Sequence, residues 1–285
     1  MIRTGRDRVN LLARRFARAF AVVSGASGLL AAQSVTLQIK PKVGDTLRLR
    51  IEQEMEITAV GRMRDVDTTM TMRSSMLMLS RSIVVLSDDD GTTVRSITDS
   101  IAVNPGALDP RLDQVRRALQ GKEVRVRFSR EGSATLVEAD PELPRDLRSV
   151  FSQLPATFPR HQVSVGSTWK QRIPIPDAAQ GQIAGTLQAV FRLDSLTSRG
   201  KRAFISMRGT LTRDSTASAM ADGGRMTMTG TVTGFMILDR VRGWVIDALT
   251  EMSVQSHIEP AAGKALPPVK MRMRLIQRQR TMDKD

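Results

Sequence analysis

Hydrophobic and polar residues alternate along most of the chain beyond residue 33. Between residues 47 and 57 nearly every second residue is leucine, isoleucine or methionine, and the positions between them are arginine or glutamate. Since successive side chains of a strand point to opposite faces, this period of two predicts a long strand with one buried face. The same alternation predicts further strands over residues 70–79, 83–86, 93–103, 124–128, 169–175, 187–196, 203–211, 226–238, 244–254 and 269–276.

Turn sequences separate the predicted strands. Asp90-Gly91, Glu131-Gly132 and Arg242-Gly243 are typical of tight connections between neighbouring antiparallel strands. The spacing favours hairpins over parallel crossovers, and a hydrophobic content of 41% is enough to bury a core. We therefore expect a mainly β fold, in which long antiparallel strands form a curved sheet or half-barrel.

Two segments depart from the alternation and predict short helices. Asp109-Pro110 and Asp140-Pro141 each place a capping carboxylate before a proline, which favours a first helical turn. Apolar residues then recur at helical spacing, which predicts helices over residues 109–121 and 140–154. Their apolar faces, which include Leu119 and Leu143, should pack on the sheet because no other large partner is available.

Two stretches of the chain resemble each other. Residues 43–51 align with residues 165–173 and share Val, Gly, Thr, Arg and Ile at matching positions. We interpret this as an internal repeat of a β-module, over residues 43–139 and 165–250. The alternative is that one kind of strand-entry turn is used twice. In both cases Gly44 and Gly166 are expected to be turn residues.

Residues 1–32 have the pattern of a secretory signal peptide. Arginines precede an apolar run over residues 19–30, and Ala31-Ala32 supply a small-residue cleavage site. The run is shorter than the roughly 20 residues that span a bilayer, so we expect cleavage after Ala32, with a retained anchor as the alternative. Residues 33–285 would then form a single β-rich domain, periplasmic or secreted.

Composition narrows the classes of partner. The net charge of +14 falls to +9 when residues 1–32, with six arginines and one aspartate, are removed. Aromatic residues make up only 4% of the chain and the arginines are dispersed, so nucleic-acid binding is not expected. The basic excess is instead compatible with peripheral contact to an anionic envelope surface. The chain has no cysteine, which excludes disulfides and thiolate metal sites.

The stretch Val165-Gly166-Ser167-Thr168-Trp169, the preceding residues 155–159 and the glycine-containing hairpins carry a resemblance. They resemble an uncharacterised family of exported bacterial β-rich proteins, a domain of unknown function with a Val-Gly-Asp-Ser-Trp-type motif. The likeness covers most of residues 35–256, and Ser167 and Thr168 depart from the commonest motif. It implies an envelope location and a β fold, and it transfers no catalytic residues. In architecture alone, a long-stranded sheet is also similar to the half-barrels of periplasmic lipoprotein and lipid carriers.

No residue pattern indicates catalysis or a metal centre. Glu52, Glu54 and Glu56 share one strand face, where they are expected to be solvated opposite cross-strand arginines. His161 and His257 lack the spacing of a zinc site and are expected to be structural. Residues 88–91 lack the ligand spacing of a calcium loop and are expected to form a hairpin tip. We therefore expect a protein that is not an enzyme and needs no cofactor.

Methionine is the unusual feature, with 16 in the chain. Pairs two residues apart share a strand face, and thioethers suit an adaptable apolar cavity. The candidate ligand-lining residues are Met70, Met72, Met76, Met78, Met226 and Met228. Ordinary core packing and binding of cuprous copper near a histidine are the alternatives for these methionines.

These observations favour an exported, non-catalytic protein that binds or carries an apolar or amphiphilic, lipid-like molecule of the cell envelope. A ligand-free scaffold or interaction protein is the first alternative. A methionine-based copper binder or an unrecognised hydrolase is the second.

Overall fold

Strands make up almost all of the regular structure. The computed structural model describes residues 34–63, 66–105, 116–143, 153–154, 156–176, 183–197, 199–213, 224–261 and 267–282. Its strands are β1 (Thr46–Met63), β2 (Val66–Ser87), β3 (Gly91–Pro105), β4 (Glu123–Ser129), β5 (Ala134–Ala139), β6 (Gln153–Leu154), β7 (Thr168–Pro176), β8 (Ile183–Thr197), β9 (Arg202–Arg213), β10 (Arg225–Asp239), β11 (Trp244–Glu259) and β12 (Val269–Met282). All lie in one unit that begins at Val35.

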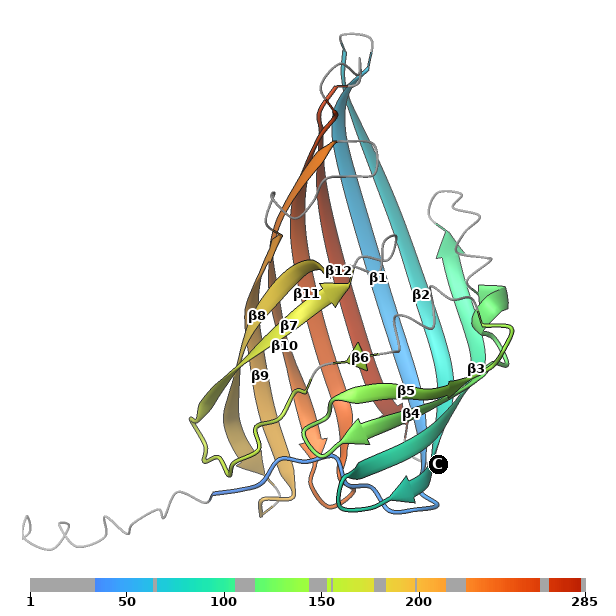
Figure 1. Cartoon of the computed structure of the whole chain (residues 1–285), viewed down its shortest axis with the longest axis vertical. Helices are drawn as coiled ribbons and strands as arrows, with labels where there is room; N and C mark the ends of the chain where they lie inside the picture. Colours follow the sequence, from blue (N-terminus) through green and yellow to red (C-terminus); the bar gives the residue numbers. More distant parts are fainter. Residues whose placement is uncertain are drawn as a thin grey trace, which may run out of the picture. The chain divides into compact units, whose positions relative to one another are not determined.

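The strands form one antiparallel sheet in the order β6-β5-β4-β3-β2-β1-β12-β11-β10-β9-β8-β7. Within β1–β6 and within β7–β12, each strand pairs with its neighbour in sequence. The two runs join where β1 lies beside β12, in a register that extends from Arg48↔Met282 to Val60↔Lys270 (Figure 1). The ends of the order, β6 and β7, are not paired with each other, so the sheet is open. The prediction of a mainly β fold with a curved antiparallel sheet is confirmed.

Alternation gives the sheet an apolar and a charged face. Leu47 and Leu49 of β1 are buried on the first, whereas Arg48 and Arg50 are exposed on the second. We call these the concave and the convex face. Directly opposed residues share a face, so the register carries the same division across the neighbouring strands.

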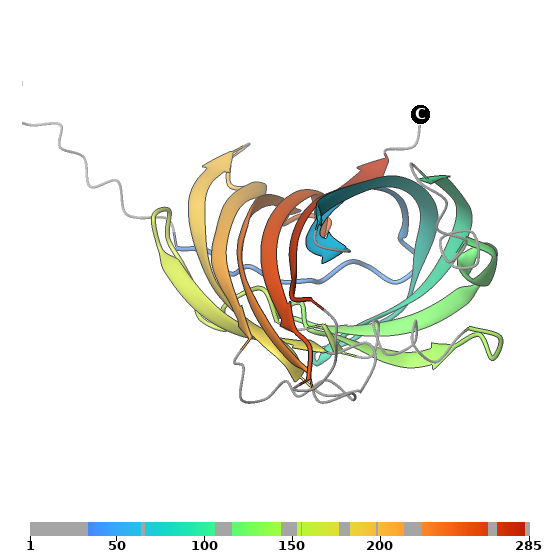
Figure 2. The ribbon, with the colours of Figure 1, turned by 90° about the horizontal axis from the view of Figure 1, so that it is seen from above.

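The sheet curls over its concave face. We call β1–β6 and β7–β12 the two arms of the sheet. Val94 and Val126 of the first arm belong to the same hydrophobic core as Phe191 and Leu193 of the second. A flat sheet would hold β4 and β8 many strands apart, so a shared core requires strong curvature. Viewed from above, the two arms bend toward each other (Figure 2).

The segment before β1 completes this core. Val35, Leu37 and Ile39 are buried, with Leu37 only 1% exposed. Ile39 donates its backbone N–H to Arg130 O at 2.9 Å, and Lys40 donates to Gly243 O at 2.9 Å. The segment therefore connects the β4–β5 turn to the β10–β11 turn across the curled sheet.

The turns that lead into β1 and β7 have the same backbone geometry. Gly44 has φ +87° and Gly166 has φ +89°, in the left-handed region that favours glycine. Gly44 donates its N–H to Val84 O at 2.9 Å, and Gly166 donates to Leu193 O at 2.7 Å. Both glycines are turn residues, as expected. This shared geometry is expected both for a repeated β-module and for one kind of strand-entry turn used twice. The internal repeat therefore stays a prediction.

The helix predictions agree only in part with the described residues. Of residues 109–121, only 116–119 are helical within the described part, and residues 109–115 lie outside it. In the second segment Asp140 closes a turn, accepting the N–H of Glu142 on Oδ1 at 2.9 Å and that of Leu143 on its carbonyl at 3.0 Å. Residues 144–152 lie outside the described residues. Residues 153–154 form β6, because pairing with β5 satisfies their backbone groups. Among the described residues, no helix has the length and apolarity needed to cross a membrane.

The strand boundaries also need correction. Residues 70–79 and 83–86 belong to one strand, β2, whose pairing with β3 is interrupted by register shifts at Leu79/Ser80 and Val84/Leu86. Such irregularities bend a strand without ending it. The prediction missed β5, although Ala134 and Leu136 alternate with polar residues directly after the Glu131-Gly132 turn.

Gly243 allows a test of how the N-terminal segment docks. It has φ +64°, and a Cβ added there would lie 2.3 Å from the carbonyl carbon of Lys40. We expect Gly243→Ala to lower the free energy of unfolding by about 3–4 kcal/mol, since backbone strain and a steric clash combine. Gly44→Ala should cost about 1–2 kcal/mol from strain alone, because no atom lies within 4 Å of its added Cβ. Urea denaturation measures both, and equal losses would contradict the docking.

Candidate ligand-binding cavity

A cavity of about 350 Å³ lies on the concave face. Its floor is one row of directly opposed residues on five neighbouring strands: Met78, Ile51, Gln279, Ala248 and Met236. With strands about 4.8 Å apart, this row is about 20 Å long. The cavity is therefore wide enough across the sheet for an elongated ligand.

The side of the cavity is formed by β3 and β4. Val94 and Ser96 of β3 lie directly opposite Val126 and Val124 of β4, and all four line the cavity. Ile39 of the N-terminal segment and Phe158 cover it. Leu119 and Leu143, which the sequence placed on apolar helix faces, also line the cavity; among the described residues, Leu119 is the last of the helical residues 116–119 and Leu143 follows the turn at Asp140.

Lys122 is the one charged side chain among the described residues that line the cavity. Its Nζ forms ion pairs with Glu142 Oε2 and, at 3.6 Å, with Asp140 Oδ2. The hydrogen bond that Lys122 donates to Glu142, supported by Asp140, raises the pKa of Lys122 above its ordinary value. The Glu142 side chain is 78% exposed, so the ion pair marks a solvent-facing side of the cavity.

The opposite end of β4 carries an aromatic pair. Phe128 and Trp244 pack edge to face, with ring centroids 5.3 Å apart and an interplanar angle of 81°. Trp244 is 6% exposed, and its Nε1 has no hydrogen-bond acceptor among the described residues. By contrast, Trp169 donates its Nε1–H to Thr157 O at 2.8 Å. This end of the cavity is therefore lined by aromatic rings, and the unpaired Nε1–H of Trp244 is itself buried.

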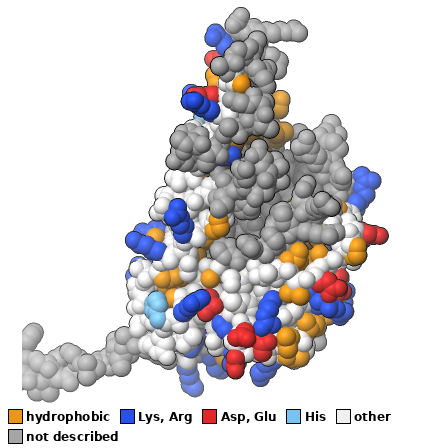
Figure 3. All heavy atoms as spheres, in the orientation of Figure 1, with side chains coloured by type: hydrophobic (Ala, Val, Ile, Leu, Met, Phe, Trp, Pro, Cys, Tyr) orange, Lys and Arg blue, Asp and Glu red, His pale blue; other side chains and the backbone are white. Residues whose placement is uncertain are grey.

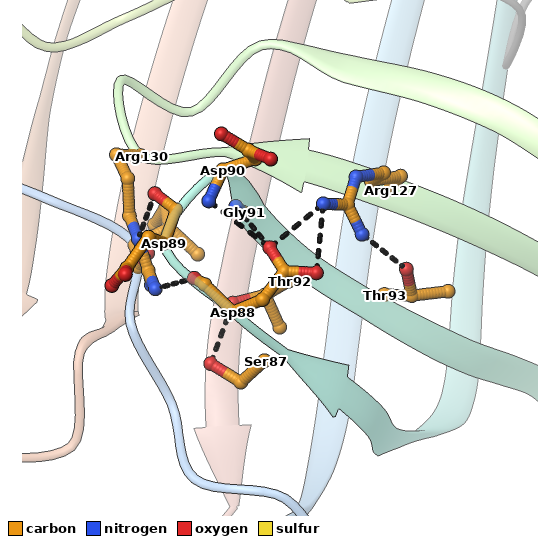
Figure 4. A network of polar contacts seen from close by, with 10 residues as sticks. Ser87, Asp88, Asp89, Asp90, Gly91, Thr92, Thr93, Arg127 and Arg130 are labelled. Carbon is orange, nitrogen blue, oxygen red and sulfur yellow. Dashed lines mark hydrogen bonds and ion pairs between the residues drawn. The ribbon is translucent and has the colours of Figure 1, made fainter.

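A polar network supports the cavity from outside (Figure 4). Arg127 donates from Nη2 to Asp88 Oδ1 at 2.8 Å and Oδ2 at 3.0 Å. Arg130 donates from Nη1 to Ile39 O at 3.0 Å and from Nη2 to Asp88 O. Since Ile39 covers the cavity, this network links the β2–β3 turn to the segment that closes it.

The same network sets the charge state of Asp88. The hydrogen bond from Arg127, together with those from the backbone N–H groups of Gly91 and Asp90, lowers the pKa of Asp88 below its ordinary value and outweighs the opposing loss of hydration. Asp88 also donates its N–H to Gly91 O at 3.0 Å. The prediction that residues 88–91 form a hairpin tip is confirmed.

The glutamates of β1 lie on the convex face, away from the cavity. Glu52 accepts from Arg50 Nη2 at 2.6 Å, and Glu56 accepts from Arg73 Nε at 2.8 Å. Glu52 lies opposite Arg278 and Glu56 lies opposite Arg73, so the expected placement opposite cross-strand arginines is confirmed for these two, whereas Glu54 lies opposite Ser75 and Ile276. In the face that Figure 3 displays, basic and acidic side chains are mixed in the same way.

The histidines do not join the cavity. His257 lies opposite Thr227 and Lys270, on the convex side of β11, and His161 is exposed. Among the described residues, no three His, Asp or Glu side chains gather into a group that could hold a metal. The copper alternative, which needs a histidine near the methionine pairs, gains no support from this placement.

The register places almost every strand methionine with a described side chain on the concave face. They are Met55, Met70, Met72, Met76, Met78, Met207, Met226, Met228, Met236, Met252, Met271 and Met273. Of the six candidate ligand-lining methionines, only Met78 lines the cavity. Met70 and Met72 lie farther along β2, where they are 58% and 40% exposed.

The sequence reasoning missed several cavity residues. Val35-Thr36-Leu37-Gln38-Ile39 alternates like a strand, a signal that could have identified the buried N-terminal segment. Met236 was overlooked because no second methionine lies two residues away. Ala248 and Trp244 carry no such signal, since their role depends on pairing between distant strands.

The fold and the cavity define a class: an open, all-β sheet with an apolar cavity on its concave face. A family model described as a family of unknown function, DUF6263, matches residues 144–245, roughly a third of the chain. No curated protein sequence matches the chain.

Three solved structures are similar over most of the chain. A structure of lipovitellin, titled for its lipid–protein interactions, covers 85% of this chain with 10% identity and a TM-score of 0.39, and the chain spans 25% of lipovitellin. OccK11 (OpdR) of Pseudomonas aeruginosa covers 87% with 8% identity and a TM-score of 0.26. The outer membrane protein OprG of the same organism covers 87% with 6% identity and a TM-score of 0.22. In both of these the match spans 100% of the other chain.

The Asp88–Arg127 pair predicts a pH dependence of stability. Because the folded-state pKa of Asp88 is lowered, the pair stabilises the fold above the unfolded-state pKa and is lost as pH falls through the folded-state value. We expect Asp88→Asn to lower the Tm slightly at pH 7 and to match the wild type once the pH lies below the folded-state pKa of Asp88. Asp89→Asn, which removes a neighbouring charge, should leave the Tm unchanged at pH 7. Equal effects of the two variants would refute the role of the pair.

Proposed function

We propose that this protein is an exported, non-catalytic binding protein, which holds an apolar or amphiphilic, lipid-like molecule of the cell envelope in the cavity on its concave face. The observation that carries this proposal is the cavity itself. Its volume of about 350 Å³ lies within the usual range of small-molecule sites. Its described lining is mostly apolar, with a few neutral polar groups and one lysine.

The form of the cavity supports an elongated ligand. The floor row extends about 20 Å across the sheet, and β4 lines the side from Val124 to Phe128. Met78 and Met236 stand at the two ends of the floor row, where flexible thioethers can adapt to chains of different shape. The many other methionines of the concave face extend this adaptable apolar surface along the strands.

The distribution of charge supports a binding role without catalysis. Glu52 and Glu56 of β1 are paired with arginines on the convex face, and His257 also lies on that face. Within the described lining, Lys122 is the only side chain with an acid–base group, and it is engaged by Glu142. Binding and release of an apolar molecule need no further chemistry.

Filling the cavity tests the proposal. Ala248 lies between Gln279 and Met236 in the floor row, and Ala248→Phe should occupy the space that the ligand needs. We expect the affinity for a fluorescent long-chain fatty acid, measured by titration of delipidated protein, to fall at least about tenfold. Ala102→Phe, on the exposed convex side of β3, is the matched control and should bind like the wild type. If the wild type binds no such probe, the scaffold alternative replaces the proposal.

Export has its own test. We expect protein purified from the envelope of its native cells to begin at Gln33, since cleavage after Ala32 leaves the buried segment from Val35 intact. N-terminal sequencing measures this. A start before Ser24 would show that the apolar run is retained.

A further inference from the structure

We infer that the convex face of β7–β9 docks on the surface of a membrane that contains anionic phospholipids. This inference goes beyond the proposed function, because it concerns a surface that lies apart from the cavity. The observation that carries it is a cluster of three exposed cations, Lys170, Arg172 and Arg208, which form no ion pair with any acidic side chain of the described residues. We call these three residues the basic patch.

Charge is distributed unequally between the two ends of the sheet. The strands β1–β6 contain eight basic and seven acidic residues, and arginines there pair with acids across strands. The strands β7–β9 contain six basic residues and one acidic residue, Asp194, which pairs with Arg192 at 3.7 Å. The β7 end of the sheet therefore carries an excess of positive charge.

The register brings the residues of the basic patch together. Lys170 of β7 and Arg208 of β9 both lie opposite Val190 of β8, so their Cα atoms are about 10 Å apart. Arg172 follows Lys170 on the same face of β7, about 7 Å away. The three side chains line an open hollow of about 780 Å³, and the described lining of this hollow contains no acidic residue.

The like charges of the basic patch repel one another. Their spacing is close to the Debye length at physiological ionic strength, about 8 Å, so salt screens the repulsion only in part. The first acidic residue in the row of Lys170 and Arg208 is Glu251, which lies beyond Thr233 and pairs with Arg274 at 2.7 Å. An anionic partner relieves this repulsion, so the patch favours one.

The rest of this surface decides which anionic partner fits. Among the described residues, none of the large exposed hydrophobic side chains lies in β7–β9. A protein partner needs aromatic or apolar anchors in its interface, and a polynucleotide needs aromatic rings for stacking. The surface of an anionic bilayer needs only exposed positive charge. Gln188, Thr210 and Thr231, which also line the hollow, are exposed and neutral, so they do not oppose such contact.

The basic patch lies on the side of the sheet away from the cavity. Trp169, whose side chain points opposite to that of Lys170, is buried in the core together with Phe191. Docking through the convex face therefore leaves the cavity uncovered, and membrane binding and ligand binding can be measured independently.

Cosedimentation of the full chain with vesicles tests the inference. We expect vesicles of phosphatidylcholine with phosphatidylglycerol to bind the protein more tightly than phosphatidylcholine alone, and high salt to release it. Each lysine or arginine near an anionic surface contributes about fivefold to the affinity, so the triple variant Lys170→Gln, Arg172→Gln, Arg208→Gln should bind roughly a hundredfold more weakly. Should circular dichroism show that this variant does not fold, Arg172→Gln and Arg208→Gln alone should each cost about fivefold.

The triple variant Arg73→Gln, Arg81→Gln, Arg125→Gln is the matched control. It removes the same net charge, but from arginines that pair with Glu56, Asp99 and Glu138, and it should retain most of the vesicle affinity.

Three outcomes would overturn the docking: equal losses in the two triple variants, equal binding to neutral and anionic vesicles, or release by inorganic phosphate at an ionic strength at which sodium chloride releases nothing. Both triple variants should bind a fluorescent fatty acid like the wild type. A wild type that binds anionic vesicles but no fatty acid would contradict the proposed function and support the docking.

Discussion

The pairing of β1 with β12 is the constraint on which the rest of the structure depends. These strands begin and end the sheet in sequence, and their register joins β1–β6 to β7–β12. Because side chains alternate across a strand, a slip of one residue would turn Leu49 and Ile51 to the convex face and bring charged residues into the cavity. The floor row, in which Ile51 lies opposite Gln279, exists only in this register.

Burial along the concave face is uneven: one part forms the packed core that stabilises the fold, and another part stays accessible. The core gathers where the N-terminal segment crosses the curled sheet, with Leu37, Phe158 and Leu193 nearly inaccessible. Farther along β2, Met70 and Met72 are exposed although they share the same face. The cavity lies beside the rigid core, so its lining is positioned by well-packed neighbours while its methionines retain freedom to adapt.

Local patterns predicted the strands well, since alternation and turn residues act over a few neighbouring positions. Residues 140–154 show the limit: the capping signal of Asp140 is real, but it closes a turn, and pairing with β5 makes residues 153–154 a strand. The methionine pairs were correctly assigned to shared faces, yet their distance from the cavity could not be predicted. That distance depends on where the sheet curls and on which strands meet, which no single segment determines.

One small residue explains why the floor row leaves space. Met78, Ile51, Gln279 and Met236 are long side chains, whereas Ala248 between Gln279 and Met236 is short. In a row of opposed residues about 4.8 Å apart, a long side chain at the position of Ala248 would meet both neighbours and fill the gap. The two arms of the sheet meet in a packed core beside this row, so the neighbouring side chains cannot close the gap. An apolar space beside a packed core persists when one position in the row is small.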